Sequence, residues 1–287
     1  LELASRLSFF LWSTLPDDEL MRVAREGRLN QPATLRGEMR RMLADPRSSA
    51  FVNNFAGQWL HLRNLRSITP NSDLFPDFDD NLRQAFRREA ELFFESVLQE
   101  NRSVLDLMTA DYTFVNERLA RHYGIDNVFG SGFRRVQLKD PARFGLLGKG
   151  AVLLATSHPT TTSPVLRGKW VLENIVGTPP PAPPPDLDTA LKTDPPGSAP
   201  KTMRAQMERH RTSPVCASCH QTMDPIGFAL ENFDVVGKWR TEDRSGLSLD
   251  TADILTDGSS IDGVTSLRQA LVRRPDIFVQ TLTEKLL

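Results

Sequence analysis

The sequence predicts a mainly α-helical protein, with a helical bundle followed by a second helical, loop-rich domain that carries a proline-rich strap. Apolar residues recur at helical spacing through the first half, most strongly over residues 78–99. Nine prolines fall between residues 178 and 200, which excludes a helix or a central strand there and predicts an extended surface segment. We expect a helical domain over residues 1–138, a second domain over 139–245, and the start of a truncated C-terminal helical domain over 246–287.

The first domain is expected to consist of helices in succession. Apolar residues at helical spacing from Leu3 to Leu11 indicate the first helix. The second begins near Pro16, where three carboxylates in its first turn favour the positive end of the helix dipole, and it ends at Gly27. Further helices are predicted at residues 34–43, 49–62, 78–99, 103–108 and 116–123.

The helix over residues 78–99 has the clearest apolar stripe, which is typical of a bundle core. The stripe consists of Leu82, Phe86, Ala90, Phe93, Phe94 and Val97. The acidic residues of this helix, Asp79, Asp80, Glu89 and Glu91, have no base or nucleophile pattern around them. We therefore expect these four carboxylates to be surface charge.

The second domain alternates short helices with loops. Residues 130–138 suit a short strand or a loop, 144–156 a buried helix, and 158–164 a polar loop bracketed by prolines. A turn and then an apolar helix are expected over 223–230, and a hairpin around Asp257 and Gly258. The remaining helices are predicted at residues 167–176, 203–211, 266–273 and 276–287.

Composition sets the class of protein. With 39% hydrophobic and 25% charged residues and a formal net charge of −1, the chain suits a soluble globular protein and gives no indication of a nucleic-acid partner. No apolar run is long enough for a transmembrane segment. The sequence begins at Leu1 without a methionine or a signal peptide, and we expect it to be a piece of a longer protein, so the missing signal peptide is no evidence of a cytoplasmic location.

Two cysteines and a histidine form the motif that carries chemistry. Cys216-Ala217-Ser218-Cys219-His220 has the spacing of a haem c attachment site. Two thiols three residues apart on a helical turn reach the two vinyl groups of one porphyrin, and the following histidine ligates the iron. The sequence therefore predicts one covalent haem c, with His220 as the proximal iron ligand.

Two other chemistries use similar residues. A redox dithiol of the thioredoxin type normally sits at a strand-to-helix turn in a βαβ unit, and that pattern is not seen here. Zinc could use Cys216, Cys219, His210 and His220, although the adjacent Cys219 and His220 would both have to turn toward one metal ion.

The second axial ligand of the iron must come from upstream of the motif, lie outside these residues, or be absent. After His220 the chain has one methionine, Met223, and no histidine, and Met223 lies too close in sequence to reach the opposite face of the haem. Upstream candidates are His158, Met203, Met207 and His210. We name His158 first, because it lies in an anchored polar loop of the kind that often carries functional groups. An open site, or a ligand outside these residues, is the alternative.

Other residues near the motif have two possible roles. Arg240, Arg167 and Lys169 could neutralise haem propionates, or could be solvated surface charges. Four apolar residues after the motif suit either the walls of a haem pocket or the ordinary core, namely Ile226, Phe228, Leu230 and Phe233.

These motifs resemble the planctomycete-type cytochrome c-like proteins, which are secreted and built from several domains of unknown function. The resemblance is carried by residues 3–20, by residues 145–170, and by Cys216–His220 with residues 224–240. It implies export to the periplasm or beyond, haem c and iron, and a cytochrome c-like haem domain over residues 139–245. It implies no reaction, and beyond Cys216, Cys219 and His220 no functional residue carries over.

Three functions follow as hypotheses. The first is electron transfer between the haem and a redox partner protein or a fused redox domain. The second is a haem enzyme of the peroxidase or oxidase type with an open distal site. The third is a zinc-binding or structural interaction domain, which would be colourless. Whether the chain is an enzyme stays open, and its catalytic residues are unknown.

Overall fold

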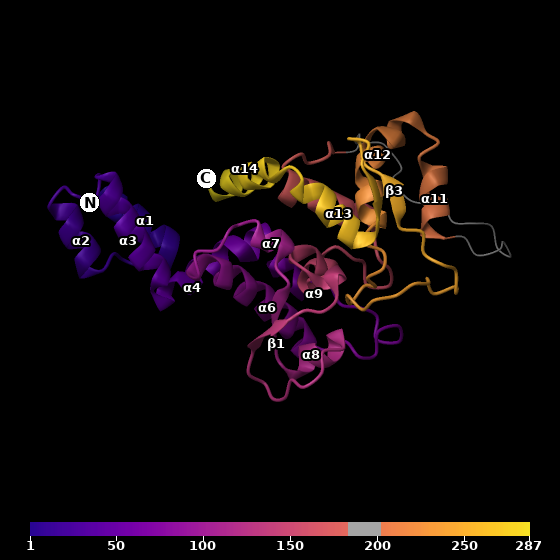
Figure 1. Ribbon diagram of the computed structural model, residues 1–287, viewed down its shortest axis with the longest axis horizontal. Helices are drawn as coiled ribbons and strands as arrows, with labels where there is room; N and C mark the ends of the chain where they lie inside the picture. Colours follow the sequence, from indigo (N-terminus) through magenta and orange to yellow (C-terminus); the bar gives the residue numbers. More distant parts are fainter. Residues whose placement is uncertain (183–201) are drawn as a thin grey trace.

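The computed structural model is mainly α-helical, as the sequence predicts, and describes residues 1–182 and 202–287. The helices α1 to α3 lie at one end of the long axis and α11 and α12 at the other, with α6 and α9 between them (Figure 1). Helices α13 and α14 run back along one side toward the N-terminal end. The chain ends beside α14, on the side of the N-terminal helices (Figure 1).

The first three helices are those that the periodicity predicts. They are α1 (Glu2–Trp12), α2 (Asp18–Arg25) and α3 (Pro32–Ala44). The Asp17 carboxylate accepts the Leu20 backbone N–H at 3.0 Å and so caps α2. Gly27 has a φ of 69°, a conformation that suits glycine and ends the helix.

The helix expected over residues 49–62 is confirmed as far as Trp59, but the segment changes helix type along its length. A 3₁₀ turn (Pro46–Ser48) leads into α4 (Ser49–Phe51), a π turn (Val52–Ala56) and α5 (Gly57–Trp59). A second 3₁₀ turn follows at Leu62–Arg66. The rings of Phe51, Phe55 and Trp59 stack in sequence along this segment, with centroids 5.3 and 5.7 Å apart. The wider π turn accompanies the packing of these aromatic rings. Counting the spacing of apolar residues does not detect such packing.

Helix α6 (Asp80–Gln99) is the predicted long helix, and its apolar stripe is buried. The expectation of surface charge is wrong for Glu89 and Glu91, which are 0% and 6% exposed. Glu89 accepts hydrogen bonds from the Thr113 hydroxyl at 2.6 Å and the Tyr123 hydroxyl at 2.7 Å. Partners far along the chain therefore satisfy this buried carboxylate.

A short sheet and two small helices complete the first domain. Helix α7 (Asp106–Thr109) precedes β1 (Tyr112–Val115), which pairs antiparallel with β2 (Arg134–Gln137), and α8 (Glu117–Tyr123) lies between the strands. Strand β2 falls in the stretch expected to be strand or loop. Its partner β1 was not predicted, because four residues give too little alternation to detect.

The second domain is built around two helices in contact, α10 (Pro164–Val171) and α12 (Pro214–Phe228). Short 3₁₀ turns (Pro141–Arg143 and Leu146–Gly148) and α9 (Gly150–Ala155) precede them. A π turn (Leu172–Val176) extends α10, and α11 (Met203–His210) leads into α12. Most of the proline-rich strap predicted over residues 178–200 lies outside the described residues.

The turn expected after Met223 is wrong, because α12 continues through Pro225 to Phe228. A proline inside a helix removes one backbone donor and normally weakens the helix. Here the turns on both sides of Pro225 pack against the backbone of α10, at Gly168 and Pro164. These contacts hold α12 against α10 on both sides of the proline.

The C-terminal part consists of the predicted hairpin and two helices. Strand β3 (Ala252–Ile254) pairs antiparallel with β4 (Ser260–Asp262), followed by α13 (Gly263–Val272) and α14 (Pro275–Leu286). The Arg268 guanidinium donates to the backbone carbonyls of Phe144 and Pro141, and so ties α13 to the second domain. Among the described residues, none of the helices has the length and apolar character needed to cross a bilayer.

Buried hydrogen bonds join residues 1–138 to residues 139–245. The Trp59 indole N–H donates to the Asn174 carbonyl at 3.1 Å. The His122 Nε2–H donates to the Val236 carbonyl at 2.7 Å. Both bonds lie within one continuous apolar core, so the two parts pack as one body around it.

Candidate functional site

Helix α12 has an accessible half and a buried half, and the motif lies on the accessible one. From Met223 to Phe228 every residue is buried, whereas Val215 at the beginning of the helix is 52% exposed. Cys216 is buried and Cys219 is partly buried, and both are free thiols. The sequence therefore presents its two thiols and His220 from the end of a helix whose other end is anchored in the core.

His220 is held by a carboxylate one helical turn further on. Its Nδ1 lies 2.9 Å from Oδ1 of Asp224. A carboxylate only accepts hydrogen bonds, so Nδ1 donates to it, and Nε2 is the ring nitrogen left for a metal ion. Asp224 is 0% exposed, and its Oδ2 has no hydrogen-bond partner but lies 3.5 Å from Nε of Arg211.

In the buried half of α12, the helix backbone is in direct contact with the backbone of α10. A Cβ atom built on Gly168 would lie 2.0 Å from the Met223 carbonyl oxygen, and one built on Gly227 would lie 2.0 Å from the Pro164 carbonyl oxygen. Only glycine allows such an approach. The two contacts thus hold α12 on both sides of Asp224, at Met223 one residue before it and at Gly227 three residues after it.

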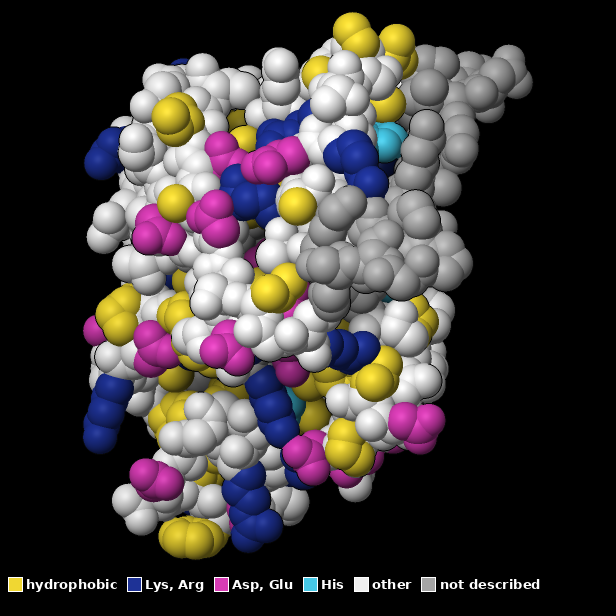
Figure 2. All heavy atoms as spheres, turned by 90° about the vertical axis from the view of Figure 1, so that its right-hand side faces the viewer, with side chains coloured by type: hydrophobic (Ala, Val, Ile, Leu, Met, Phe, Trp, Pro, Cys, Tyr) yellow, Lys and Arg dark blue, Asp and Glu magenta, His cyan; other side chains and the backbone are white. Residues whose placement is uncertain are grey.

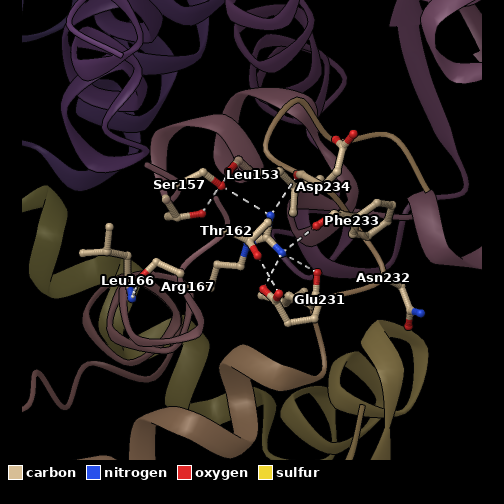
Figure 3. A network of polar contacts seen from close by, with 12 residues as sticks. Leu153, Ser157, Thr162, Leu166, Arg167, Glu231, Asn232, Phe233 and Asp234 are labelled. Atoms are coloured by element: carbon tan, nitrogen blue, oxygen red, sulfur yellow. Dashed lines mark hydrogen bonds and ion pairs between the residues drawn. The ribbon is translucent and has the colours of Figure 1, made fainter. Parts of the chain in front are cut away.

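Beside this contact lies a buried ion network centred on Arg167 (Figure 3). The Arg167 guanidinium donates to Oε1 of Glu231 at 3.0 Å and to the carbonyls of Leu230, Phe233 and Asp234. Arg167 is 1% exposed, and its burial lowers the pKa of its guanidinium. The expectation that Arg167 is a solvated charge is therefore wrong, and its contacts give it a structural role.

Arg240 belongs to the same network. Its guanidinium donates to Oε2 of Glu231 at 2.9 Å and to the Thr162 hydroxyl at 3.0 Å. It also lines a cavity of about 530 Å³ beside Arg204 at the start of α11 and Phe228 at the end of α12. The cysteines and His220 do not line this cavity. Lys169, by contrast, is solvated and lies 3.5 Å from Glu173.

The candidates for a second axial ligand are placed very differently. His158 is exposed, and its backbone N–H donates to the Thr161 carbonyl within its own turn. His210, at the end of α11, has its ring centroid 5.0 Å from that of His220, with the two rings near perpendicular. Met207 is buried and Met203 is partly buried on the same helix. The structure thus brings His210, and not His158, into contact with His220.

The residues of the motif include those that a haem c would need. Two thiols, an imidazole with a free Nε2 and a buried acceptor for Nδ1–H form the arrangement that iron–histidine ligation uses. For zinc, the side chains of His, Cys, Asp and Glu within the described parts of the chain include no group of three or more placed to hold one ion. The apolar residues Ile226, Phe228, Leu230 and Phe233 are all buried in the core.

Charged side chains of both signs are interleaved on the end face that carries α11 and α12 (Figure 2). Lys and Arg side chains lie directly beside Asp and Glu on this face, without a patch of one sign. A partner that docks on the drawn part of this face therefore meets no large field of one charge.

Comparisons with known proteins match two families of unknown function. Residues 1–125 match the family model described as PSD4, a protein of unknown function (DUF1592). Residues 143–243 match the one described as PSCyt3, a protein of unknown function (DUF1588). Both matches fit the planctomycete-type cytochrome c-like domains that the sequence motifs resemble. No curated protein and no solved structure matches the chain.

Proposed function

We propose that this chain is an exported c-type haem protein that transfers single electrons between its haem and a partner protein or a fused redox domain. The observation that carries the proposal is the placement of Cys216, Cys219 and His220 on the accessible half of α12, with His220 oriented by Asp224. The cytochrome-like match over residues 143–243 supports it.

Each of these residues would have a defined task. Cys216 and Cys219 would add their S–H bonds across the two vinyl groups and hold the ring as thioethers. His220 would ligate the iron through Nε2, because Nδ1–H is bonded to Asp224. The bound group supplies an iron that changes oxidation state by one electron. The buried half of α12 would limit movement of the ligand between the two states, as a carrier requires.

Arg240 remains a proposed propionate partner, although its guanidinium already binds Glu231. Its side chain is 23% exposed, so one edge faces the cavity beside α11. His158 remains the second axial ligand that the sequence names. His210 is favoured by its proximity to His220, and its ring would have to move away from that of His220 to admit the haem between them.

A haem enzyme with an open distal site is the second candidate. It is favoured by the carboxylate on His220, because a hydrogen bond of that kind makes a histidine a stronger electron donor to iron. Such an enzyme would have high-spin iron that binds carbon monoxide or cyanide readily. A carrier would have low-spin, six-coordinate iron.

The test is a pyridine haemochrome spectrum of protein exported in a host that matures cytochromes c. A c-type α-band that survives acid–acetone extraction is expected. A colourless protein, or a haem that the extraction removes, would contradict the proposal. The spin state of the intact protein then separates the carrier from the enzyme.

A further inference from the structure

We propose that Asp224 controls the donor strength of the iron ligand His220 and so holds the reduction potential of the haem low. The inference rests on the proposed haem function and names the residue that tunes it. No residue other than Cys216, Cys219 and His220 follows from the sequence motif, so this role for Asp224 is read from the structure.

The geometry supports a strong and persistent hydrogen bond. His220 and Asp224 stand four residues apart on α12, which places their side chains on one face. The distance from Nδ1 to Oδ1 is 2.9 Å, within the range of charge-assisted bonds. Asp224 is fully buried, so water does not compete for its oxygen atoms.

The backbone around Asp224 cannot easily shift. Met223, its neighbour, presents its carbonyl oxygen to Gly168, and Gly227 touches the carbonyl of Pro164. These contacts hold the Cα of Asp224 in place on α12. The side chain therefore keeps the orientation that meets His220, and it acts as a positioning residue behind the ligand.

A guanidinium lies beside Asp224 without replacing its bond to His220. The Arg211 guanidinium lies 3.5 Å from Oδ2, on the side of the carboxylate away from the histidine. Arg211 also lies 3.9 Å from Glu208 on α11, so its charge is shared between two carboxylates. Oδ2 has no hydrogen-bond partner of its own.

A carboxylate at this position has a different effect from a neutral acceptor. It draws the Nδ1 proton toward itself and gives the imidazole partial negative charge, which strengthens donation from Nε2. It also places a buried negative charge near the iron, where low dielectric makes the interaction large. Both effects favour the oxidised, more positive iron and lower the reduction potential.

The experiment compares Asp224→Asn with Glu208→Gln in the haem-loaded protein. Both changes remove one carboxylate next to Arg211, but only the first changes the acceptor on His220. We expect Asp224→Asn to favour the reduced form at least tenfold, about 59 mV for a one-electron couple. Glu208→Gln should change the potential several-fold less, and Asp224→Glu should recover part of the difference.

A second measurement does not depend on a variant. In the reduced, low-spin protein, the Nδ1–H proton of His220 should give a strongly downfield NMR signal that exchanges slowly with water. Wild-type protein with covalent haem but a rapidly exchanging Nδ1–H would overturn the inference. Equal reduction potentials in Asp224→Asn and Glu208→Gln would also overturn it. Neither of these two results would contradict the proposed haem function. Absence of covalent haem would instead reject the proposed function itself.

Discussion

The α-carbon of Gly168 lies so close to the carbonyl oxygen of Met223 that a Cβ atom at residue 168 would stand 2.0 Å from it. Met223 immediately precedes Asp224, the carboxylate that holds His220. A glycine on α10 therefore determines the position of the candidate iron ligand on α12. The site and the packing of the core are linked through this one contact.

Gly168→Ala should destabilise the fold, because the new methyl group meets backbone rather than a side chain that can turn away. Overpacking of this kind costs about 1–3 kcal/mol, and a backbone contact should lie at the upper end. Gly37→Ala on α3 is the matched control, since nothing lies within 4 Å of its Cβ position. There we expect no loss, or a gain of up to about 1 kcal/mol. Denaturant unfolding of both variants checks this, and equal stabilities would contradict the packing argument.

Glu231→Gln should also destabilise the protein, because it leaves Arg167 buried without its carboxylate. Removing one partner of a buried ion pair costs about 3–5 kcal/mol. Glu173→Gln removes a carboxylate from the exposed pair with Lys169 and should cost less than about 1 kcal/mol. Unfolding free energies of the two variants measure the difference, and a loss in Glu231→Gln no larger than in Glu173→Gln would be incompatible with the network.

Acid should destabilise the fold through the buried His122. Burial lowers the pKa of His122 from 6.5 to about 4 in the folded protein. Between these values the unfolded chain binds the extra proton and the folded chain does not, so stability falls as the pH falls from about 6.5 to about 4. The full difference corresponds to about 3 kcal/mol.

His122→Gln provides the test, because glutamine still has an N–H to donate but does not titrate in this range. We expect the free energy of unfolding of the wild type to fall more steeply than that of the variant below pH 6.5. Curves that stay parallel from pH 7.5 to pH 4 would show that His122 is not responsible.

Most of the helices were predictable from sequence because they are specified locally. Capping carboxylates such as Asp17 and Asp79, and apolar residues three and four apart, act within a single turn or two. Burial of Glu89 was not predictable in this way. Its partners Thr113 and Tyr123 come from β1 and α8, and nothing within α6 indicates them.

The candidate site was predictable in part. The haem motif follows from spacing alone, whereas the role of Asp224 depends on α12 running through Pro225. A turn predicted at that proline interrupts the helical spacing that places His220 and Asp224, four residues apart, on one face of a helix. The contacts of Gly168 and Gly227 with another helix remove the turn, and they are tertiary facts that local propensity does not contain.

Each thioether can be tested alone. Cys216→Ala or Cys219→Ala should leave haem attached through one bond and one free vinyl group, which moves the α-band of the pyridine haemochrome to longer wavelength. Ser218→Ala, between the two cysteines and exposed, should retain the wild-type band. His220→Ala should abolish normal ligation. Wild-type spectra in the cysteine variants would refute attachment at these residues.

The second axial ligand is tested by two histidine variants of the haem-loaded protein. His210→Ala is expected to convert low-spin iron to a high-spin form that binds carbon monoxide, because the His210 ring lies next to His220 and needs only to move to the opposite face of the haem. His158→Ala should leave the spectrum unchanged, since the side chain is exposed and its turn is held by its own backbone bond to Thr161. The reverse outcome would restore His158, the ligand that the sequence names. High-spin iron already present in the wild type would mean that neither histidine ligates, and it would favour the haem enzyme over the carrier.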